Sequence, residues 1–136
     1  MSEPENALEA RRWMKYARED LQAADLILGH PTIANRHVCW LSQQTVEKAL
    51  KAALIYLQIE FPRTHDLDIL RNLLPGEWEA KMVSLDLAEM TEWAVESRYP
   101  GDWPDVTESD ARAAFDLARK MTDAMGVDLE NRGLKL

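Results

Sequence analysis

Glycine and proline are confined almost entirely to the ends of apolar segments in this 136-residue chain. Proline restricts its own backbone and that of the residue before it, and glycine readily takes the left-handed conformation that ends helices. The boundaries are Gly29 with Pro31, then Pro62, then Pro75 with Gly76, then the stretch from Pro100 to Pro104, and finally Gly126. Because the segments between them contain no helix breaker, each of them can form a helix.

Each segment places apolar residues three and four positions apart, which is the pattern of an amphipathic helix. The expected helices cover residues of about 5–28, 34–58, 66–74, 78–97 and 107–126. The second is the most apolar, which predicts a central place in the fold. Either Asp105 with Glu108 or Thr107 with Asp110 could form a capping box at the start of the last helix.

The chain contains no segment with the alternating pattern of a strand, and no unit of about twenty to fifty residues repeats. The sequence therefore predicts an all-α fold, an antiparallel up-and-down bundle of four long helices plus one short helix. We assign residues 5–126 to this bundle. Residues 127–136 are expected to form a C-terminal tail that is frayed or contacts a partner.

Composition favours one globular domain, with 46% hydrophobic and 29% charged residues. The formal net charge of -8 repels phosphate, so sequence-independent binding of nucleic acid would need a local basic face. Residues 1–10 are acidic and lack an apolar run, and no run of about 18 apolar residues could span a membrane. We therefore expect a cytoplasmic protein without a membrane segment.

The chain contains one cysteine and three histidines, the two residue types that most often bind structural zinc. Cys39 lies in an apolar helical stretch and is predicted to be a buried hydrophobe rather than a nucleophile. The three histidines, His30, His37 and His65, have no paired zinc spacing. We therefore expect no metal site and no cofactor.

Polar side chains line one side of the second predicted helix. They are His37, Gln44, Lys48 and Lys51, with Gln43 and Glu47 alongside. Amide and ammonium donors on one side of a helix could bind a phosphate or a partner carboxylate. The alternative is a solvated face in which Glu47 and Lys51 form an ordinary four-spaced ion pair.

The loop before the short helix gathers a cation, a hydroxyl, an imidazole and a carboxylate: Arg63, Thr64, His65 and Asp66. Loops on rigid scaffolds often carry functional sites. The structural alternative is that Thr64 or Asp66 caps the short helix and that His65 bonds the backbone at the helix start.

Arg98 and Tyr99 end the fourth segment, directly before Pro100. An arginine beside a tyrosine can grip a phosphate and stack on a base. Equally, Arg98 could complement the helix dipole while Tyr99 covers the end of the bundle.

Three stretches of this sequence occur together in a familiar order. They are Ala17-Arg18-Glu19-Asp20-Leu21 with Ala24, then Gln44-Thr45-Val46-Glu47-Lys48-Ala49-Leu50-Lys51-Ala52, then Thr64-His65-Asp66-Leu67 followed by Arg98-Tyr99-Pro100. From about Trp13 to Met125 the chain resembles the HEPN domain, the helical module of higher eukaryotes and prokaryotes nucleotide-binding proteins. The resemblance implies a bundle of about five helices that commonly dimerises. It also implies association with nucleotides or RNA, and a frequent pairing with a minimal nucleotidyltransferase as toxin and antitoxin.

Many HEPN proteins are metal-independent ribonucleases whose motif is an arginine, four to six intervening residues and a histidine, paired across a dimer. The upstream positions of all three histidines lack that arginine, at residues 23–25, 30–32 and 58–60. The usual arrangement of a general acid/base histidine beside a charge-stabilising arginine is therefore absent from the sequence. A divergent site built from His65 with Arg63 or Arg98 is the alternative.

The resemblance and these residues together predict a homodimeric module that binds a nucleotide or a nucleotidyltransferase partner. The expected contact groups are Gln44, Lys48 and Lys51 as donors, His65 with Asp66 as a loop pair, Arg98 with Tyr99 as a phosphate and stacking pair, and Asp20, which orients one of the cations. Two alternatives stay open. One is a metal-independent ribonuclease toxin, and the other is a plain dimerisation scaffold in which the same residues cap helices and satisfy the core.

Overall fold

The computed structural model describes residues 3–82, 87–96, 100–101 and 104–136. Within these ranges it contains six helices and no strand. The helices are α1 (Glu5–Ile27), α2 (Asn35–Tyr56), α3 (Leu67–Asn72), α4 (Glu79–Met82), α5 (Leu87–Glu96) and α6 (Glu108–Asn131). The prediction of an all-α helical bundle is confirmed.

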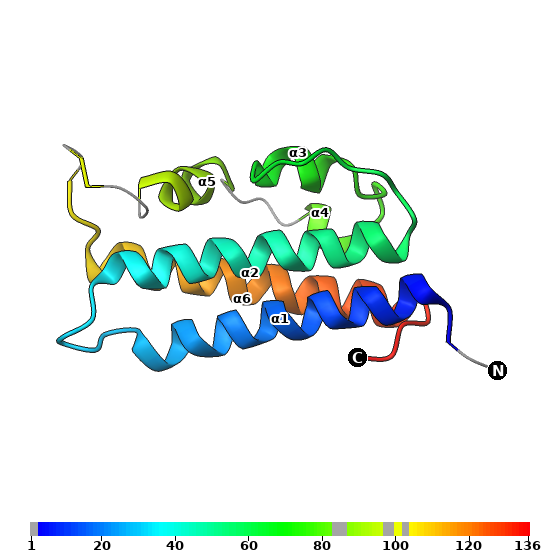
Figure 1. Ribbon diagram of the computed structural model, residues 1–136, viewed down its shortest axis with the longest axis horizontal. Coiled ribbons are helices and arrows are strands. Elements are labelled where there is room, and N and C mark those ends of the chain that lie inside the picture. The colour runs from blue at the N-terminus through cyan, green and yellow to red at the C-terminus, as the bar shows by residue number, and fades with distance from the viewer. Residues whose placement is uncertain (1–2, 83–86, 97–99, 102–103) are drawn as a thin grey trace.

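Three long helices, α1, α2 and α6, lie side by side (Figure 1). The chain runs in the same direction along α2 and α6 and in the opposite direction along α1. Helices α3 and α5 pack on α2 along the side away from α1 (Figure 1). Because α2 contacts α1, α3, α5 and α6, side chains on different faces of α2 meet different partners. Across the described ranges, no helix combines the length and the apolar character that a bilayer crossing requires.

The predicted apolar stripes form the core. Met14, Ala17 and Ala24 of α1 are buried, as are Val46 and Leu50 of α2. The predicted stripe of the last helix is buried throughout, at Ala111, Ala114, Ala118, Met121 and Met125. Many of these residues are alanines, whose small side chains let the long helices approach closely.

Helix α6 begins with the predicted capping box. Thr107 Oγ1 accepts a hydrogen bond from the backbone N–H of Asp110 at 3.1 Å, and Asp110 Oδ2 accepts one from the N–H of Thr107 at 3.1 Å. The two bonds satisfy N–H groups that have no partner inside the helix.

Helix α6 does not end at Gly126, where we predicted its end, but continues to Asn131. The glycine that terminates the helix is Gly133, which follows the C-cap Arg132 and has a φ of +97°. The N–H of Gly133 donates to the carbonyl of Glu130 at 3.0 Å, and that of Leu134 donates to the carbonyl of Leu129 at 3.0 Å. These bonds form a Schellman motif, and Leu129 and Leu134 supply the buried apolar contact that accompanies it. The first part of the predicted tail is therefore helical.

The segment predicted as one helix at residues 78–97 is helical at Glu79–Met82 and at Leu87–Glu96. The residues between α4 and α5 lie outside the described ranges, so a single continuous helix stays a prediction.

Asp128 of α6 holds the start of α4, because its two carboxylate oxygens each accept a backbone hydrogen bond at 3.0 Å, from Glu79 and from Ala80.

Candidate functional site

A buried carboxylate lies at the centre of the polar side of α2. Glu47 is only 5% exposed, and Gln43, one turn before it, is fully buried. Both residues fall on the helical row that continues through Leu50 and Leu54, two core residues. The local spacing thus directs an acid and an amide toward the interior, where each polar atom needs a partner.

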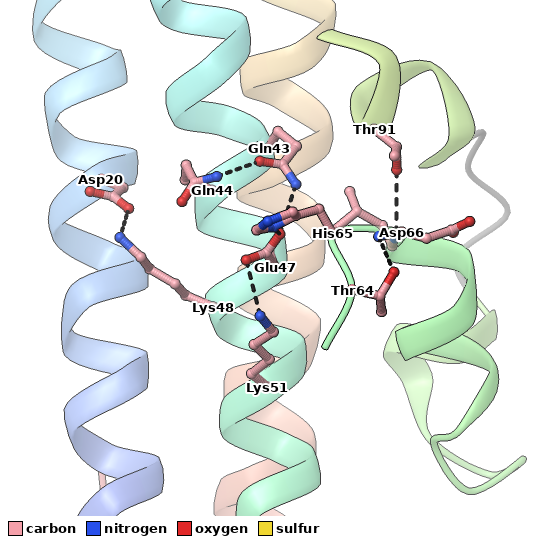
Figure 2. A network of polar contacts seen from close by, with 11 residues as sticks. Asp20, Gln43, Gln44, Glu47, Lys48, Lys51, Thr64, His65, Asp66 and Thr91 are labelled. Atoms are coloured by element: carbon pink, nitrogen blue, oxygen red, sulfur yellow. Dashed lines mark hydrogen bonds and ion pairs between the residues drawn. The ribbon is translucent and has the colours of Figure 1, made fainter. Parts of the chain in front are cut away.

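Both oxygens of Glu47 have such partners (Figure 2). Oε1 lies 2.7 Å from His65 Nδ1 and accepts a hydrogen bond from Gln43 Nε2 at 3.1 Å. Oε2 lies 3.2 Å from Lys51 Nζ. Gln44 extends the network, since its Nε2 donates to Gln43 Oε1 at 2.7 Å. We call Gln43, Glu47, Lys51 and His65 the Glu47 centre.

Glu47 is ionised at neutral pH. Burial raises the pKa of Glu47, but the hydrogen bonds from His65 and Gln43 and the charge of Lys51 outweigh it and hold the pKa below the ordinary 4.5. An ionised carboxylate can only accept hydrogen bonds, so His65 donates from Nδ1. The side chain of His65 is 58% exposed. The ring is therefore held at Nδ1, and Nε2 has no hydrogen-bond partner among the described residues.

The start of α3 holds the loop that carries His65. Asp66 is the N-cap, and its Oδ1 accepts from the backbone N–H of Asp68 at 3.0 Å and of Ile69 at 3.2 Å. Thr64 Oγ1 accepts from the N–H of Asp66 at 3.0 Å. The capping role considered for Asp66 is confirmed, and its pairing with His65 in ligand binding stays a prediction.

A second polar contact joins α2 to α1. Lys48 Nζ lies 2.5 Å from Asp20 Oδ2, and both side chains are about a quarter exposed (Figure 2). Asp20 thus pairs with one of the predicted cations, and its part in ligand binding stays a prediction. Lys51 also meets α1, because its Nζ lies 6.0 Å from the centre of the Trp13 ring, within reach of a cation–π interaction.

The predicted ligand residues thus fall into two connected sets, Gln44, Lys51 and His65 around Glu47, and Lys48 with Asp20. Arg98 and Tyr99 lie outside the described residues, so their role as a phosphate and stacking pair stays a prediction. Sequence analysis placed Gln43 and Glu47 beside the polar row of α2 but predicted neither the burial of Glu47 nor its contact with His65. The signal was present, because both residues share a helical row with Leu50.

Cys39 is buried, as predicted. Burial raises the pKa of its thiol to about 12, with smaller contributions from the charges of Asp110 and Glu89, so it stays protonated. In the part of the chain that the structure describes, no cluster of three or more histidine, cysteine, aspartate or glutamate side chains could hold a metal ion.

The architecture defines a helical bundle with a carboxylate–imidazole–ammonium centre on its second helix. The sequence model of the HEPN domain family matches residues 10–128. The chain therefore belongs to the HEPN domain family, and the resemblance drawn from its motifs is confirmed.

Two solved structures share the fold. TT1696 from Thermus thermophilus is 25% identical, with a TM-score of 0.68 over 88% of this chain and 98% of that one. ST0689, an archaeal HEPN homologue, is 25% identical, with a TM-score of 0.63 over 85% of this chain and 93% of that one. No curated protein matches the chain significantly.

Proposed function

We propose that this HEPN-family chain is a binding module for a nucleotide or an RNA segment, and that the Glu47 centre contacts the phosphate. The observation that carries the proposal is His65, an exposed ring held at Nδ1 by a buried carboxylate. A ring fixed in this way presents Nε2 in one direction, so little rotational freedom is lost when a ligand binds.

The charges of the site favour an anion once His65 is protonated. Lys51 is balanced by Glu47 and Lys48 by Asp20, so the two ion pairs together are neutral. Each ammonium group has three N–H donors, of which the carboxylate uses one. A protonated His65 adds one positive charge and a donor at Nε2. A phosphate oxygen can accept a hydrogen bond from Nε2 only when the ring is protonated, because the neutral ring donates from Nδ1 to Glu47.

Isothermal titration calorimetry with ATP, other nucleotides and short RNAs tests the proposal. His65→Ala is expected to weaken binding about tenfold, the loss of one charge-assisted hydrogen bond. His37→Ala is the matched control, because His37 is an exposed histidine near the start of α2. If none of the ligands binds, or if the control weakens binding equally, the site is not the Glu47 centre.

The proposal extends to partners. Membership of the HEPN family supports a homodimer and a minimal nucleotidyltransferase partner, with which the chain would form a toxin–antitoxin pair in the cytoplasm. A nucleotidyltransferase reading frame beside the gene, co-purification of the two proteins and sedimentation of the chain alone as a dimer are the expected findings. Sedimentation as a monomer at micromolar concentration would rule out the homodimer.

A second candidate function is a ribonuclease with a divergent site. The contact between Glu47 and His65 favours it, because a carboxylate that orients an imidazole is an arrangement used for general acid/base catalysis. Arg63 lies two residues before His65 and is exposed. Cleavage of RNA in the presence of EDTA that stops in His65→Ala would establish this function. Intact RNA after incubation with the wild-type protein would eliminate it.

A further inference from the structure

A groove on α1, next to Leu136, shares no residue with the Glu47 centre. Its volume is about 380 Å³, and its lining includes Arg11, Met14, Lys15, Arg18, Glu19 and Leu136. Small-molecule sites typically have volumes of about 300–1,000 Å³, so the groove is large enough for a small ligand.

The charged lining comes from one face of α1. Arg11, Lys15 and Arg18 are spaced four and three residues apart, which places them along one side of the helix. Because Arg11 pairs with Glu3, Lys15 and Arg18 against Glu19 leave the groove with an excess of one positive side-chain charge, in a chain whose formal net charge is -8. A locally positive groove attracts anions.

The three cations differ in whether they have a partner in the structure. Arg11 is held in place, because its guanidinium pairs with Glu3 and its Nε donates to the carbonyl of Lys135 at 2.7 Å. Across the ranges that the structure describes, neither Lys15 nor Arg18 has an ion pair or a side-chain hydrogen bond. Their donors are therefore available to a ligand.

Gly126 of α6 lies close to the end of the Arg18 side chain. A Cβ atom on Gly126 would lie 3.2 Å from Arg18 Nη2 and 3.8 Å from Leu136 Cδ1. The first distance is tighter than ordinary van der Waals contact, so a side chain there would require the end of the Arg18 side chain to shift by a few tenths of an ångström. A glycine inside a helix is unfavourable by itself, and the close approach of Arg18 gives this one a structural reason.

The rest of the lining consists of Gln22 and two apolar residues, Met14 and Leu136. Met14 is only 1% exposed, and Leu136 packs against the main hydrophobic core. The planar guanidinium group of an arginine can bind a carboxylate or a phosphate with two parallel hydrogen bonds, and the ammonium group of a lysine adds a second positive charge. We propose that this groove binds a small amphiphilic anion, an organic phosphate or carboxylate whose charged group meets Lys15 and Arg18 and whose short apolar part packs against Leu136.

Calorimetric titration of the full chain with hexyl phosphate, hexanoate and inorganic phosphate tests the site. We expect saturable binding of hexyl phosphate or hexanoate, and the comparison of the two shows which anion is preferred. Inorganic phosphate is expected to bind more weakly because it lacks the apolar part. Arg18→Ala and Lys15→Ala should each weaken binding about tenfold.

Arg12→Ala is the matched control, because Arg12 is an exposed cation of the same helix and does not line the groove. The absence of saturable binding of both organic anions would overturn the proposal, and so would a loss in Arg12→Ala equal to that in Arg18→Ala. The proposal does not depend on the function assigned to the Glu47 centre. If His65→Ala, and not Arg18→Ala, abolishes binding of hexyl phosphate, that ligand occupies the Glu47 centre and the groove proposal fails.

Discussion

The Glu47 centre and the α1 groove present the same kinds of side chain in opposite electrostatic settings. Lys51 shares a nearly buried carboxylate with His65 and Gln43, whereas Lys15 and Arg18 have no carboxylate partner among the described residues. The centre is built around an acid, Glu47, whose two oxygens meet three donors. The groove has an excess of positive side-chain charge at neutral pH. Partners, rather than the number of cations, thus determine what each region can bind.

The largest expected effect is loss of the buried acceptor. Glu47→Ala leaves three donors, on Gln43, Lys51 and His65, without their carboxylate. We expect the free energy of unfolding to fall by about 2–3 kcal/mol, measured by urea denaturation at neutral pH. Glu19→Ala is the control from the groove and should change it by no more than about 0.5 kcal/mol. Equal effects of the two variants would show that Glu47 is not a structural centre.

The same carboxylate should make stability depend on pH. The pKa of Glu47 in the folded chain is below its ordinary 4.5, so the stabilisation is fully present above that value and is lost as the pH falls through the folded pKa. Urea denaturation at a series of acidic pH values should show a shallower decline in Glu47→Gln than in the wild type. Identical slopes would contradict the assigned direction of the shift.

A smaller difference should separate the lysines of the two regions. Lys51→Ala removes one of three donors to a buried carboxylate and should reduce the free energy of unfolding by about 1 kcal/mol. Lys15→Ala removes a side chain without a described partner and should change it by less than about 0.5 kcal/mol. Thermal denaturation of the two variants measures the difference. A larger loss of stability in Lys15→Ala than in Lys51→Ala would contradict the prediction.

The smallest effect is expected at the partly exposed pair of Lys48 and Asp20. Because each side chain is about a quarter exposed, water weakens their attraction, and Lys48→Ala should cost about 0.5 kcal/mol. The difference from the wild type should shrink further in high salt. Chemical denaturation at low and high salt provides the measurement, and a difference that grows with salt would contradict a screened ion pair.

Local patterns predicted the helices and most of the buried stripes, because amphipathic spacing and capping chemistry act over a few residues. Thr107 and Asp110 illustrate this, since the box needs no contact from elsewhere in the chain. The predicted end of α6 at Gly126 was wrong because a glycine can also serve close packing between helices. The true end needed Gly133 together with two buried leucines, whose burial depends on the tertiary structure.

The site was predictable only in part for the same reason. Gln44, Lys48, Lys51 and His65 were selected from residue type and spacing, but the contact that organises them joins residues on separate elements, Glu47 of α2 and His65 of the loop. Sequence spacing placed Glu47 beside Lys51 and gave no reason to expect a third partner. The row shared by Gln43, Glu47 and Leu50 was the available indication that this acid is buried.

Nuclear magnetic resonance of the protein with ring-¹⁵N-labelled histidine tests most directly whether the Glu47 centre binds the phosphate of a nucleotide. Titration with ATP and with a short RNA should shift the His65 Nε2 resonance saturably for at least one ligand, while His30 and His37 change little. In Glu47→Gln the same shift should require more ligand, because the ring is held less firmly. A His65 resonance that stays unchanged under saturating ligand, or equal shifts of all three histidines, would contradict the account.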